Sequence, residues 1–361
     1  MTTRRQFLKK TGVGLGVLSS AHSFANIIVP QDRKLGVALV GLGYYSTDVL
    51  APALQLTEAC ELRGIVTGSP WKIPKWQEKY GIKEANVYNY ENMSDIANNP
   101  DIDAIYVVLP NSLHAQYAIV AAEAGKHVWC EKPMCPTVEE CQQVIDACNR
   151  NKVQLTVGYR MQHEDNTRKI MQYATDRPFG KIQKIDAWAG YRHSSGDHWK
   201  CKKEMGGGVF YDMGVYPLQA ARYSAGEEPI SIKARHETER PDMFAEVDET
   251  TYFDLEFPSG AVAACMASFS KGGSELKVKC ERGQYELNPF QSYSGVKGKA
   301  SDGTVLAAVK YNQQARQMDD DARAIKRKES PLVPGEEGMR DIAIVEAGYR
   351  SAQQGGETIR L

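Results

Sequence analysis

The sequence has no large excess of charge of either sign. Its 361 residues include 44 Lys and Arg against 45 Asp and Glu, which leaves a formal net charge of −1. Without a basic excess, the composition gives no indication of binding to nucleic acid or to an anionic membrane. No segment beyond the first 25 residues is long and apolar enough for stable insertion across a bilayer. A hydrophobic fraction of 42% excludes a disordered chain, and the length predicts two globular domains.

The sequence also lacks the cysteine spacing of a disulfide framework or a zinc site. No two of its cysteines form a C-x-x-C pair. Some lie in apolar surroundings, for example Cys265 between Ala264 and Met266. We therefore expect small buried thiols in a protein that folds under reducing conditions, and no metal site. The cysteines are Cys60, Cys130, Cys135, Cys141, Cys148, Cys201, Cys265 and Cys280.

The first 25 residues are typical of an export signal. Arg4 and Arg5 are followed by a weakly apolar run over residues 11–21 and by small residues at a cleavage position, Ser23-Phe24-Ala25. The segment resembles a bacterial twin-arginine signal, which implies export of the folded protein by the twin-arginine machinery and a periplasmic location. A cytosolic protein with a basic N-terminal helix is the alternative. Cleavage after Ala25 would leave a mildly acidic chain.

The next part of the sequence alternates short apolar runs with helical segments. Strands are expected over residues 35–40, 61–67, 103–109, 126–130 and 153–159. Helices are expected between them, one of which opens with a capping box formed by Thr137 and Glu140. Strands separated by single helices predict an α/β domain with a doubly wound parallel sheet, over residues 34–158.

The pattern changes after Tyr159. Runs rich in β-forming residues are expected as strands over 182–191, 230–238, 249–257, 261–268, 275–280 and 284–287. Helices are expected over 165–175, 314–327 and 336–353, and a glycine-rich turn followed by a helix is expected over 206–224. This order predicts an α+β domain over residues 159–361, with an open, mostly antiparallel sheet and helices on one face.

A glycine-rich turn at the end of the first strand indicates a dinucleotide site. Gly41 permits a tight turn, and Gly43 lets the backbone approach a pyrophosphate at a helix N-terminus. Ser46 stands where the fingerprint has a third glycine. A plain turn between core elements is the alternative. The segment after the second strand has no carboxylate for a ribose hydroxyl, and it offers Thr67 and Lys72 instead, which favours NADP over NAD. A solvated lysine would explain Lys72 equally well.

Five motifs occur in an order that resembles a known family. They are Gly41-Leu42-Gly43, Leu109–His114, Glu131-Lys132-Pro133, Gly158-Tyr159-Arg160 and the segment from Gly206 to Tyr216. Together they are similar to the Gfo/Idh/MocA oxidoreductases, and most closely to the glucose–fructose oxidoreductase branch. The resemblance implies a Rossmann domain for the nicotinamide cofactor. It also implies an open-sheet domain that supplies substrate groups and a dimer interface, and hence a homo-oligomer.

The resemblance and the chemistry together identify Lys132, Asp212 and Tyr216 as catalytic candidates. Oxidation of a sugar at its anomeric carbon removes a hydride and a proton, and the proton needs a protein base. Tyr216 is the candidate base, and a nearby ammonium such as Lys132 would lower the pKa of a phenol. Asp212 lies four residues before Tyr216 and can orient Lys132. The alternatives are a surface lysine, a helix cap and a core aromatic. Pro217 would bend a helix that ran through it.

The remaining site predictions come from matching positions of the family. Positions matched to the cofactor are Gly41, Leu42, Gly43, Tyr44, Tyr45, Thr67, Lys72, Tyr90, Leu109, Asn111, His114, Glu131, Lys132, Arg160, Trp199, Lys200 and Tyr293. Lys200 departs from the family, which often has arginine there. Substrate contacts are expected from the three catalytic candidates and from His193 and His198, although both histidines fit an exposed loop as well.

Three functions are compatible with these residues. The first is a periplasmic sugar oxidoreductase that retains NADP and passes hydride from one sugar to another in a ping-pong cycle. The second is an aldose or cyclitol dehydrogenase with exchangeable cofactor. The third is a sugar- and dinucleotide-binding protein without catalysis. The glucose–fructose oxidoreductases trap NADP with a long N-terminal arm. Here residues 26–34 span at most about 30 Å, which puts permanent retention in doubt.

Overall fold

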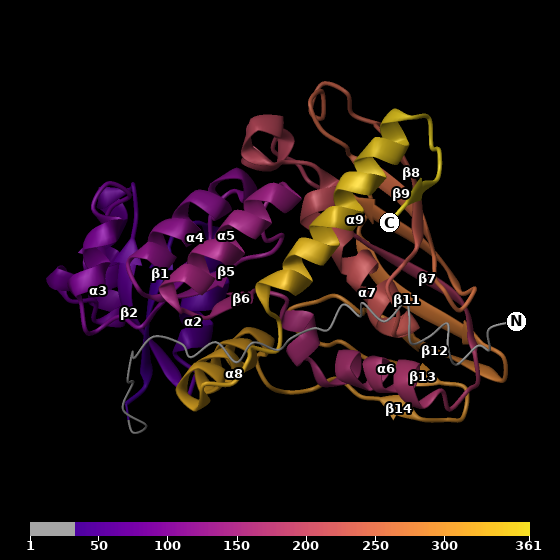
Figure 1. Ribbon diagram of the computed structural model, residues 1–361, viewed down its shortest axis with the longest axis horizontal. Coiled ribbons are helices and arrows are strands. Elements are labelled where there is room, and N and C mark those ends of the chain that lie inside the picture. Colours follow the sequence, from indigo (N-terminus) through magenta and orange to yellow (C-terminus); the bar gives the residue numbers. More distant parts are fainter. Residues whose placement is uncertain (1–32) are drawn as a thin grey trace, which may run out of the picture.

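The computed structural model describes residues 33–361, which form two halves that lie side by side (Figure 1). The predicted export signal over residues 1–25 lies outside the described residues. Each half is built around one β-sheet. The helices are α2 (Ala51–Leu54), α3 (Ile73–Tyr80), α4 (His114–Glu123), α5 (Val138–Asn151), α6 (Asp165–Asp176), α7 (Val215–Ala225), α8 (Gln313–Arg327) and α9 (Gly335–Gln353).

The first sheet is parallel, and within residues 33–361 it has the strand order β3-β2-β1-β4-β5-β6. This order is typical of dinucleotide-binding folds, in which the ligand lies at the carboxyl ends of the strands where the order reverses, between β1 and β4. The strands are β1 (Leu35–Val40), β2 (Cys60–Val66), β3 (Val87–Tyr88), β4 (Ala104–Val107), β5 (His127–Cys130) and β6 (Leu155–Val157).

Helices cover both faces of the first sheet, so its central strand is apolar at every position. All residues of β1 are buried. Ala38 and Val40 belong to the same buried cluster as residues of α4 and α5. Val37 and Leu39 point to the opposite face, where they share a cluster with residues of α2 and α8. The predicted capping box at the start of α5 is confirmed by the reciprocal bonds of Thr137 and Glu140.

The second sheet has the order β14-β13-β12-β11-β7-β10-β9-β8-β15 within the described residues. It is mostly antiparallel, which confirms the predicted fold class, but β7 and β10 pair in parallel. The strands are β7 (Ile182–Gly190), β8 (Ser231–Glu237), β9 (Thr250–Glu256), β10 (Val262–Ser268), β11 (Gly273–Cys280), β12 (Gly283–Leu287), β13 (Gly298–Ala300), β14 (Val305–Leu306) and β15 (Ile359–Arg360).

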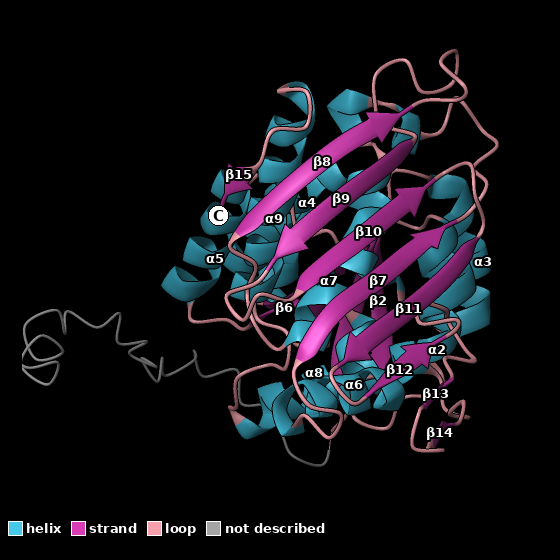
Figure 2. Ribbon diagram, turned by 90° about the vertical axis from the view of Figure 1, so that its right-hand side faces the viewer, coloured by secondary structure: helices cyan, strands magenta, loops and turns pink. Residues whose placement is uncertain are grey.

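Within residues 33–361, helices lie on one face of the second sheet only. In Figure 2 strands β8 to β12 lie in front of the helices, and their near face is uncovered. The covered face forms the largest buried cluster, with Leu218 and Ala221 of α7 against Ile185 of β7 and Leu276 of β11. The open face explains the alternation of buried and exposed residues along β8, β9 and β11.

α8 comes after strands β7 to β14 of the second sheet in the chain and yet packs on the first sheet. Its Met318, Ala322 and Ile325 share a buried cluster with Val37 and Leu39 of β1. Figure 1 shows the helix beneath the first half. The first half therefore obtains part of its core from a distant segment of the sequence.

The predicted buried thiols are confirmed. All eight cysteines lie in the described residues, and each is buried and free.

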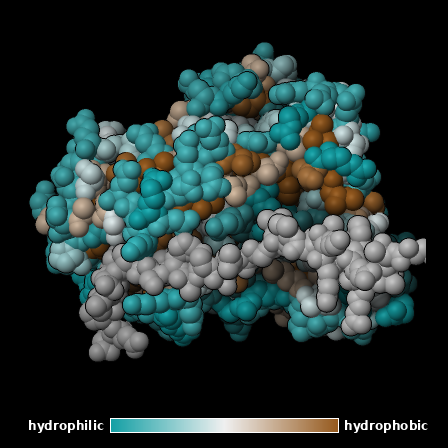
Figure 3. Space-filling view, in the orientation of Figure 1, coloured by the Kyte–Doolittle hydropathy of each residue, from teal (hydrophilic) through white to brown (hydrophobic). Residues whose placement is uncertain are grey.

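On the face shown in Figure 3 hydrophilic residues predominate, and hydrophobic residues show in separate groups. Among residues 33–361 no helix has the length and apolar character needed to cross a bilayer.

Candidate functional site

The glycine-rich turn at the end of β1 has the geometry that the sequence predicts. Gly41 has φ +88°, and a Cβ there would lie 2.4 Å from the carbonyl oxygen of Val108, so only glycine fits. A Cβ at Gly43 would meet nothing within 4 Å, because the backbone there faces open space. Ser46 replaces the third glycine, and its buried hydroxyl donates a 2.5 Å hydrogen bond to the carbonyl of Gly41. The serine thus holds the turn closed.

Three residues that are predicted to contact the cofactor, Thr67, Lys72 and Tyr90, lie together near this turn. The Lys72 ammonium donates a 2.6 Å hydrogen bond to the carbonyl of Leu42. Thr67 is buried directly after β2, and its hydroxyl accepts a bond from the N–H of Ser69 at 3.0 Å. The Tyr90 ring lies against Gly68, where an added Cβ would be 3.0 Å from it. Tyr44, on the turn itself, is exposed.

The two halves meet at Lys132, Asp212 and Tyr216. Lys132 comes shortly after β5, and its Nζ donates to the backbone carbonyl of Asp212 at 2.7 Å and to Oδ1 of the carboxylate at 3.3 Å. The same Nζ lies 4.9 Å from the centre of the Tyr216 ring. Burial alone would lower the pKa of Lys132, but Tyr216 and the Asp212 carboxylate outweigh it and raise the pKa above its usual range. The ammonium is therefore charged at neutral pH.

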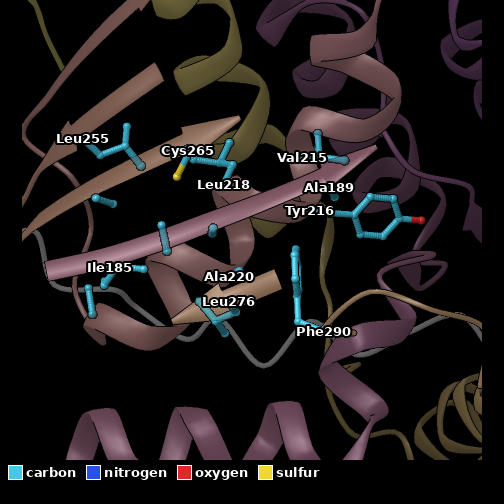
Figure 4. Close-up of a cluster of buried hydrophobic side chains, with 14 of the residues drawn as sticks. Ile185, Ala189, Val215, Tyr216, Leu218, Ala220, Leu255, Cys265, Leu276 and Phe290 are labelled. Atoms are coloured by element: carbon cyan, nitrogen blue, oxygen red, sulfur yellow. The ribbon is translucent and has the colours of Figure 1, made fainter. Parts of the chain in front are cut away.

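The backbone before α7 aims Tyr216 at this meeting point. A wide π-helical turn over Phe210–Gly214 carries Asp212, and α7 begins directly afterwards at Val215. Pro217 thus lies in the first turn of α7, where its missing N–H is not needed, and it does not bend the helix interior. Figure 4 shows the Tyr216 hydroxyl pointing away from the apolar cluster around Leu218 and Leu276.

A second lysine and a second tyrosine share the same carboxylate. Lys200 Nζ lies 2.7 Å from Oδ2 of Asp212 and donates to the Tyr191 hydroxyl at 2.9 Å. Tyr191 in turn donates to Oδ2 at 3.1 Å. Burial alone would raise the pKa of Asp212, but Lys200 and Lys132 hold it well below its usual range. Tyr191 was not predicted from the sequence, because a tyrosine at the end of a β-strand has no motif around it.

Arg160 connects the catalytic candidates with the glycine-rich turn. Its buried guanidinium lies 5.7 Å from the ring centre of Tyr216 and 5.1 Å from that of Tyr293. Nη1 donates to the carbonyl of Ser292 at 2.7 Å and to the side chain of Gln313. Nε and Nη2 have no hydrogen-bond partner in residues 33–361. The Tyr293 ring in turn lies 5.9 Å from that of Tyr45, at the end of the turn.

Three further predicted residues act as supports in the structure. The Asn111 amide donates a 2.7 Å hydrogen bond to the carbonyl of Gly206, which joins the two halves. The ring nitrogens of His114 are each 2.9 Å from a carbonyl oxygen, one of Leu109 and one of Pro133. Glu131 is buried, accepts a 2.6 Å hydrogen bond from Tyr106, and has a pKa raised by that burial.

His193 and His198 lie beside the Lys200 segment. His193 is buried, contacts the carbonyl of Ser195 at 2.9 Å, and packs 5.3 Å from the His198 ring. His198 accepts a hydrogen bond from the N–H of Lys200 at 3.3 Å, and the Lys200 ammonium lies over the Trp199 ring at 5.8 Å. Burial lowers the pKa of both histidines. Neither histidine contacts Asp212 directly. Their contact with the substrate therefore stays a prediction.

The residues around the turn fit a nicotinamide dinucleotide. Gly43 leaves space for a pyrophosphate, Lys72 supplies a cation, and no carboxylate follows β2 to repel a phosphate. Lys132 and Tyr216 lie at the same carboxyl edge of the first sheet, where the reactive ring of such a ligand belongs. Among residues 33–361 no group of three His, Cys, Asp or Glu side chains is arranged to hold a metal ion.

Comparison with known proteins identifies the family of this chain. A family model described as an oxidoreductase family with an NAD-binding Rossmann fold matches residues 35–159, and the GFO/IDH/MocA C-terminal domain matches residues 167–286. The solved structure of aldose-aldose oxidoreductase from Caulobacter crescentus, complexed with glycerol, is 36% identical with a TM-score of 0.87. The match covers 91% of this chain and 100% of the Caulobacter crescentus chain.

Two curated relatives are more distant in sequence but also match over nearly their whole length. D-xylose 1-dehydrogenase [NADP(+)] of Haloarcula marismortui is 26% identical, covering 91% of this chain and 94% of the relative. D-glucoside 3-dehydrogenase of Escherichia coli is 25% identical, covering 89% of this chain and 96% of the relative. The matched domains, the two-sheet architecture and the ordered motifs agree, and they confirm the resemblance found in the sequence. The chain belongs to the Gfo/Idh/MocA family of oxidoreductases.

Proposed function

We propose that this protein is a sugar oxidoreductase of the glucose–fructose oxidoreductase type, which transfers hydride between the anomeric carbon of a sugar and NADP. The observation that carries the proposal is the meeting of Lys132, Asp212 and Tyr216 at the carboxyl edge of the Rossmann sheet. Lys132 lies 80 residues before Asp212 in the sequence and belongs to the first half of the fold, whereas Asp212 and Tyr216 belong to the second. A structural role alone does not require an ammonium to be buried beside a phenol and a carboxylate.

The chemistry follows from these positions. Oxidation breaks the C–H bond, whose electron pair leaves as hydride to the bound nicotinamide, and the O–H bond, whose proton a protein base accepts. Tyr216 is placed to accept that proton, and in the reverse reaction to return it to a carbonyl oxygen. Lys132 provides an N–H and a positive charge next to the substrate oxygen. Asp212 fixes the position of Lys132 and stays ionised.

The proposal names NADP because Lys72 and Thr67 stand where NAD-binding folds usually have a carboxylate. The relative from Haloarcula marismortui, whose name specifies NADP(+), supports the same choice. NAD remains the competing cofactor in the test below.

The export motif adds a location to the proposal. A twin-arginine signal implies delivery of the folded, loaded protein to the periplasm, where no nicotinamide pool exists. The enzyme would then work as a cycle in which one sugar reduces the bound cofactor and a second sugar oxidises it again. Such a ping-pong cycle, and assembly as a homo-oligomer, complete the proposal. A dehydrogenase with exchangeable cofactor is the second candidate, which the relatives named as dehydrogenases favour.

The decisive experiment is a sugar-panel assay with NADP or NAD that follows the absorbance of reduced nicotinamide. We expect turnover with at least one aldose, and Tyr216→Phe should reduce kcat by a factor of about 100 or more while NADP still binds. Tyr252→Phe is a matched control, because Tyr252 lies on the open face of the second sheet. Unchanged turnover in Tyr216→Phe would refute its role as the base. Tight sugar and nucleotide binding without any turnover would indicate the non-catalytic alternative.

A further inference from the structure

The carboxylate of Asp212 carries two ammonium–phenol pairs, one on each oxygen. Lys132 contacts Oδ1 and lies 4.9 Å from the centre of the Tyr216 ring. Lys200 contacts Oδ2 and lies 5.2 Å from the centre of the Tyr191 ring. The first pair is the acid–base machinery of the proposed function. The second pair, Lys200 and Tyr191, also consists of an ammonium and a phenol at the same carboxylate. The proposed mechanism assigns no role to this second pair.

Lys200 is placed to bind a ligand as well as to support Asp212. An ammonium has three N–H donors, and the structure occupies two of them, with Asp212 and with the Tyr191 hydroxyl. Its side chain is 22% exposed, so the remaining donor is within reach of a ligand. Tyr191 and Trp199 flank the ammonium with their rings, and His198 accepts a hydrogen bond from its backbone N–H. These contacts fix the direction of a long, flexible side chain.

The two ammonium groups are close enough for one small ligand to contact both. Each is bound to one oxygen of the same carboxylate, at 3.3 Å for Lys132 and at 2.7 Å for Lys200. A ligand whose reacting oxygen lies at Lys132 can therefore reach Lys200 with an oxygen on a neighbouring carbon. Two hydroxyls on adjacent carbons are present in every unmodified aldose and in cyclitols.

We infer that Lys200, held by Tyr191, binds the hydroxyl on the carbon next to the one oxidised, and thereby selects substrates with adjacent hydroxyls. This inference rests on the proposed function, because the reacting hydroxyl is the one placed at Lys132 and Tyr216. A site that binds a hydroxyl through a charged donor discriminates strongly against an analogue that lacks this hydroxyl, since the donor is then left unpaired. Lys200 is thus a specificity-determining residue.

The test compares an aldose with its 2-deoxy analogue on the NADP-loaded protein. For the wild type we expect kcat/KM to fall by roughly ten- to a hundredfold when the 2-hydroxyl is missing. In Lys200→Met we expect kcat/KM to fall for both sugars, because Asp212 loses an ion-pair partner, but the two sugars should then differ by less than about threefold, because only the aldose loses a contact with its 2-hydroxyl. Tyr191→Phe should reduce the ratio in part, and Lys200→Arg should restore most of it.

Controls separate this inference from the proposed function. Lys203→Met changes an exposed lysine of the same segment and should leave the ratio at its wild-type value. An equal ratio in wild type and Lys200→Met would overturn the inference even if the enzyme turns over every sugar. If no sugar is oxidised at all, the proposed function fails. Calorimetric titration of the two sugars into the loaded protein then still decides the inference, because binding should show the same dependence on Lys200.

Discussion

At the scale of single residues, the site is organised around one carboxylate. Asp212 contacts Lys132 and Lys200, and its pKa is held well below its usual range. Its charge therefore does not change between pH 5 and pH 9, and it keeps both ammonium groups in place over that range. Any pH dependence of turnover in this range must come from other groups that take part in proton transfer.

Lys72 provides the residue-scale test of cofactor choice. We expect Lys72→Ala to raise the Kd of the nucleotide-free protein for NADP by roughly ten- to fiftyfold, because a phosphate at the ribose would lose a charged donor. The Kd for NAD should change by less than about twofold. Calorimetric titration of protein from which bound nucleotide has been removed measures the two values. Lys75→Ala, an exposed lysine of α3, serves as the control. Equal effects on NADP and NAD would contradict the assignment.

The sequence was informative about residues that carry motifs and silent about those that do not. Lys132 and Asp212 were predicted together, and the structure brings them into contact. Tyr191 could not be predicted, because its role depends on a strand end that packing places beside Asp212. The supporting contact of Tyr106 with Glu131 was equally invisible, since it joins two neighbouring parallel strands whose register is a tertiary property.

At the scale of elements, α8 is the helix on which both halves depend. Gln313, Gln317 and Asp321 are spaced by four residues and form one buried polar stripe. Gln313 binds Arg160, and Gln317 donates to the Tyr106 hydroxyl at 3.2 Å. The helix therefore supports the site through polar contacts while its apolar face completes the core of the first sheet.

Asp319 links α8 to the start of β2. Its carboxylate accepts hydrogen bonds from the backbone N–H groups of Glu58 and Ala59 at 2.9 and 2.7 Å. We expect Asp319→Ala to reduce the free energy of unfolding by roughly 1–3 kcal/mol, because both N–H groups lose their acceptor. Urea denaturation measures the difference. Asp254→Ala, at an exposed position of β9, should stay within about 0.5 kcal/mol of the wild type. A similar small effect for Asp319→Ala would show that water replaces the link.

Asp321 gives α8 a pH-dependent effect on stability. Burial raises the pKa of this carboxyl to about 6, and its Oδ2 has no partner in the described residues. The folded protein therefore binds the proton more tightly than the unfolded chain, so stability falls as the pH rises through the range from about 4 to 6. Above that range the buried charge lowers the free energy of unfolding by roughly 2–3 kcal/mol.

Asp321→Asn removes this charge without changing the shape of the side chain. We expect the variant to be more stable than the wild type at pH 8, by up to the cost of the buried charge. The gain should shrink below pH 6 and disappear below about pH 3, where the wild-type carboxyl is protonated in both the folded and the unfolded state. Thermal denaturation across this pH range tests the expectation, with Asp254→Asn as the exposed control. A gain that is independent of pH would contradict the assignment.

Most elements were predictable because their patterns are long. β1 is apolar throughout, and the strands and helices of both sheets were expected within a few residues of their observed bounds. The short strands β3, β13, β14 and β15 were missed, since two or three residues carry no periodic signal. The parallel pairing of β7 with β10 was also missed, because the residue pattern of a strand does not reveal the direction of its neighbour.

At the scale of the whole molecule, the site exists only where the two halves touch. Asn111 binds Gly206, Lys132 binds Asp212, and the Tyr45 ring packs near that of Tyr293. The contact between Tyr45 and Tyr293 joins the two halves beside the glycine-rich turn. The proposed two-sugar cycle requires slow release of the cofactor, and we expect this contact to contribute to it.

The absorbance spectrum of the protein purified without added cofactor tests this expectation. We expect bound nucleotide in close to one equivalent per chain, reduced on addition of one sugar and oxidised again by a second. A spectrum without nucleotide, together with turnover that depends on added NADP, would contradict retention and favour an exchangeable dehydrogenase. Released nucleotide should be identified after denaturation, so that NADP and NAD are distinguished.

The position of α8 has a consequence for recombining this protein with its relatives. Residues 313–327 come after strands β7 to β14 of the second sheet in the sequence but contribute Met318 and Ile325 to the core beneath β1. A chimera cut once between the two sheets would combine one parent's nucleotide-binding half with the other parent's α8. A chimera should fold only when α8 and the first half come from the same parent. The segments taken from one parent are then not contiguous in the sequence.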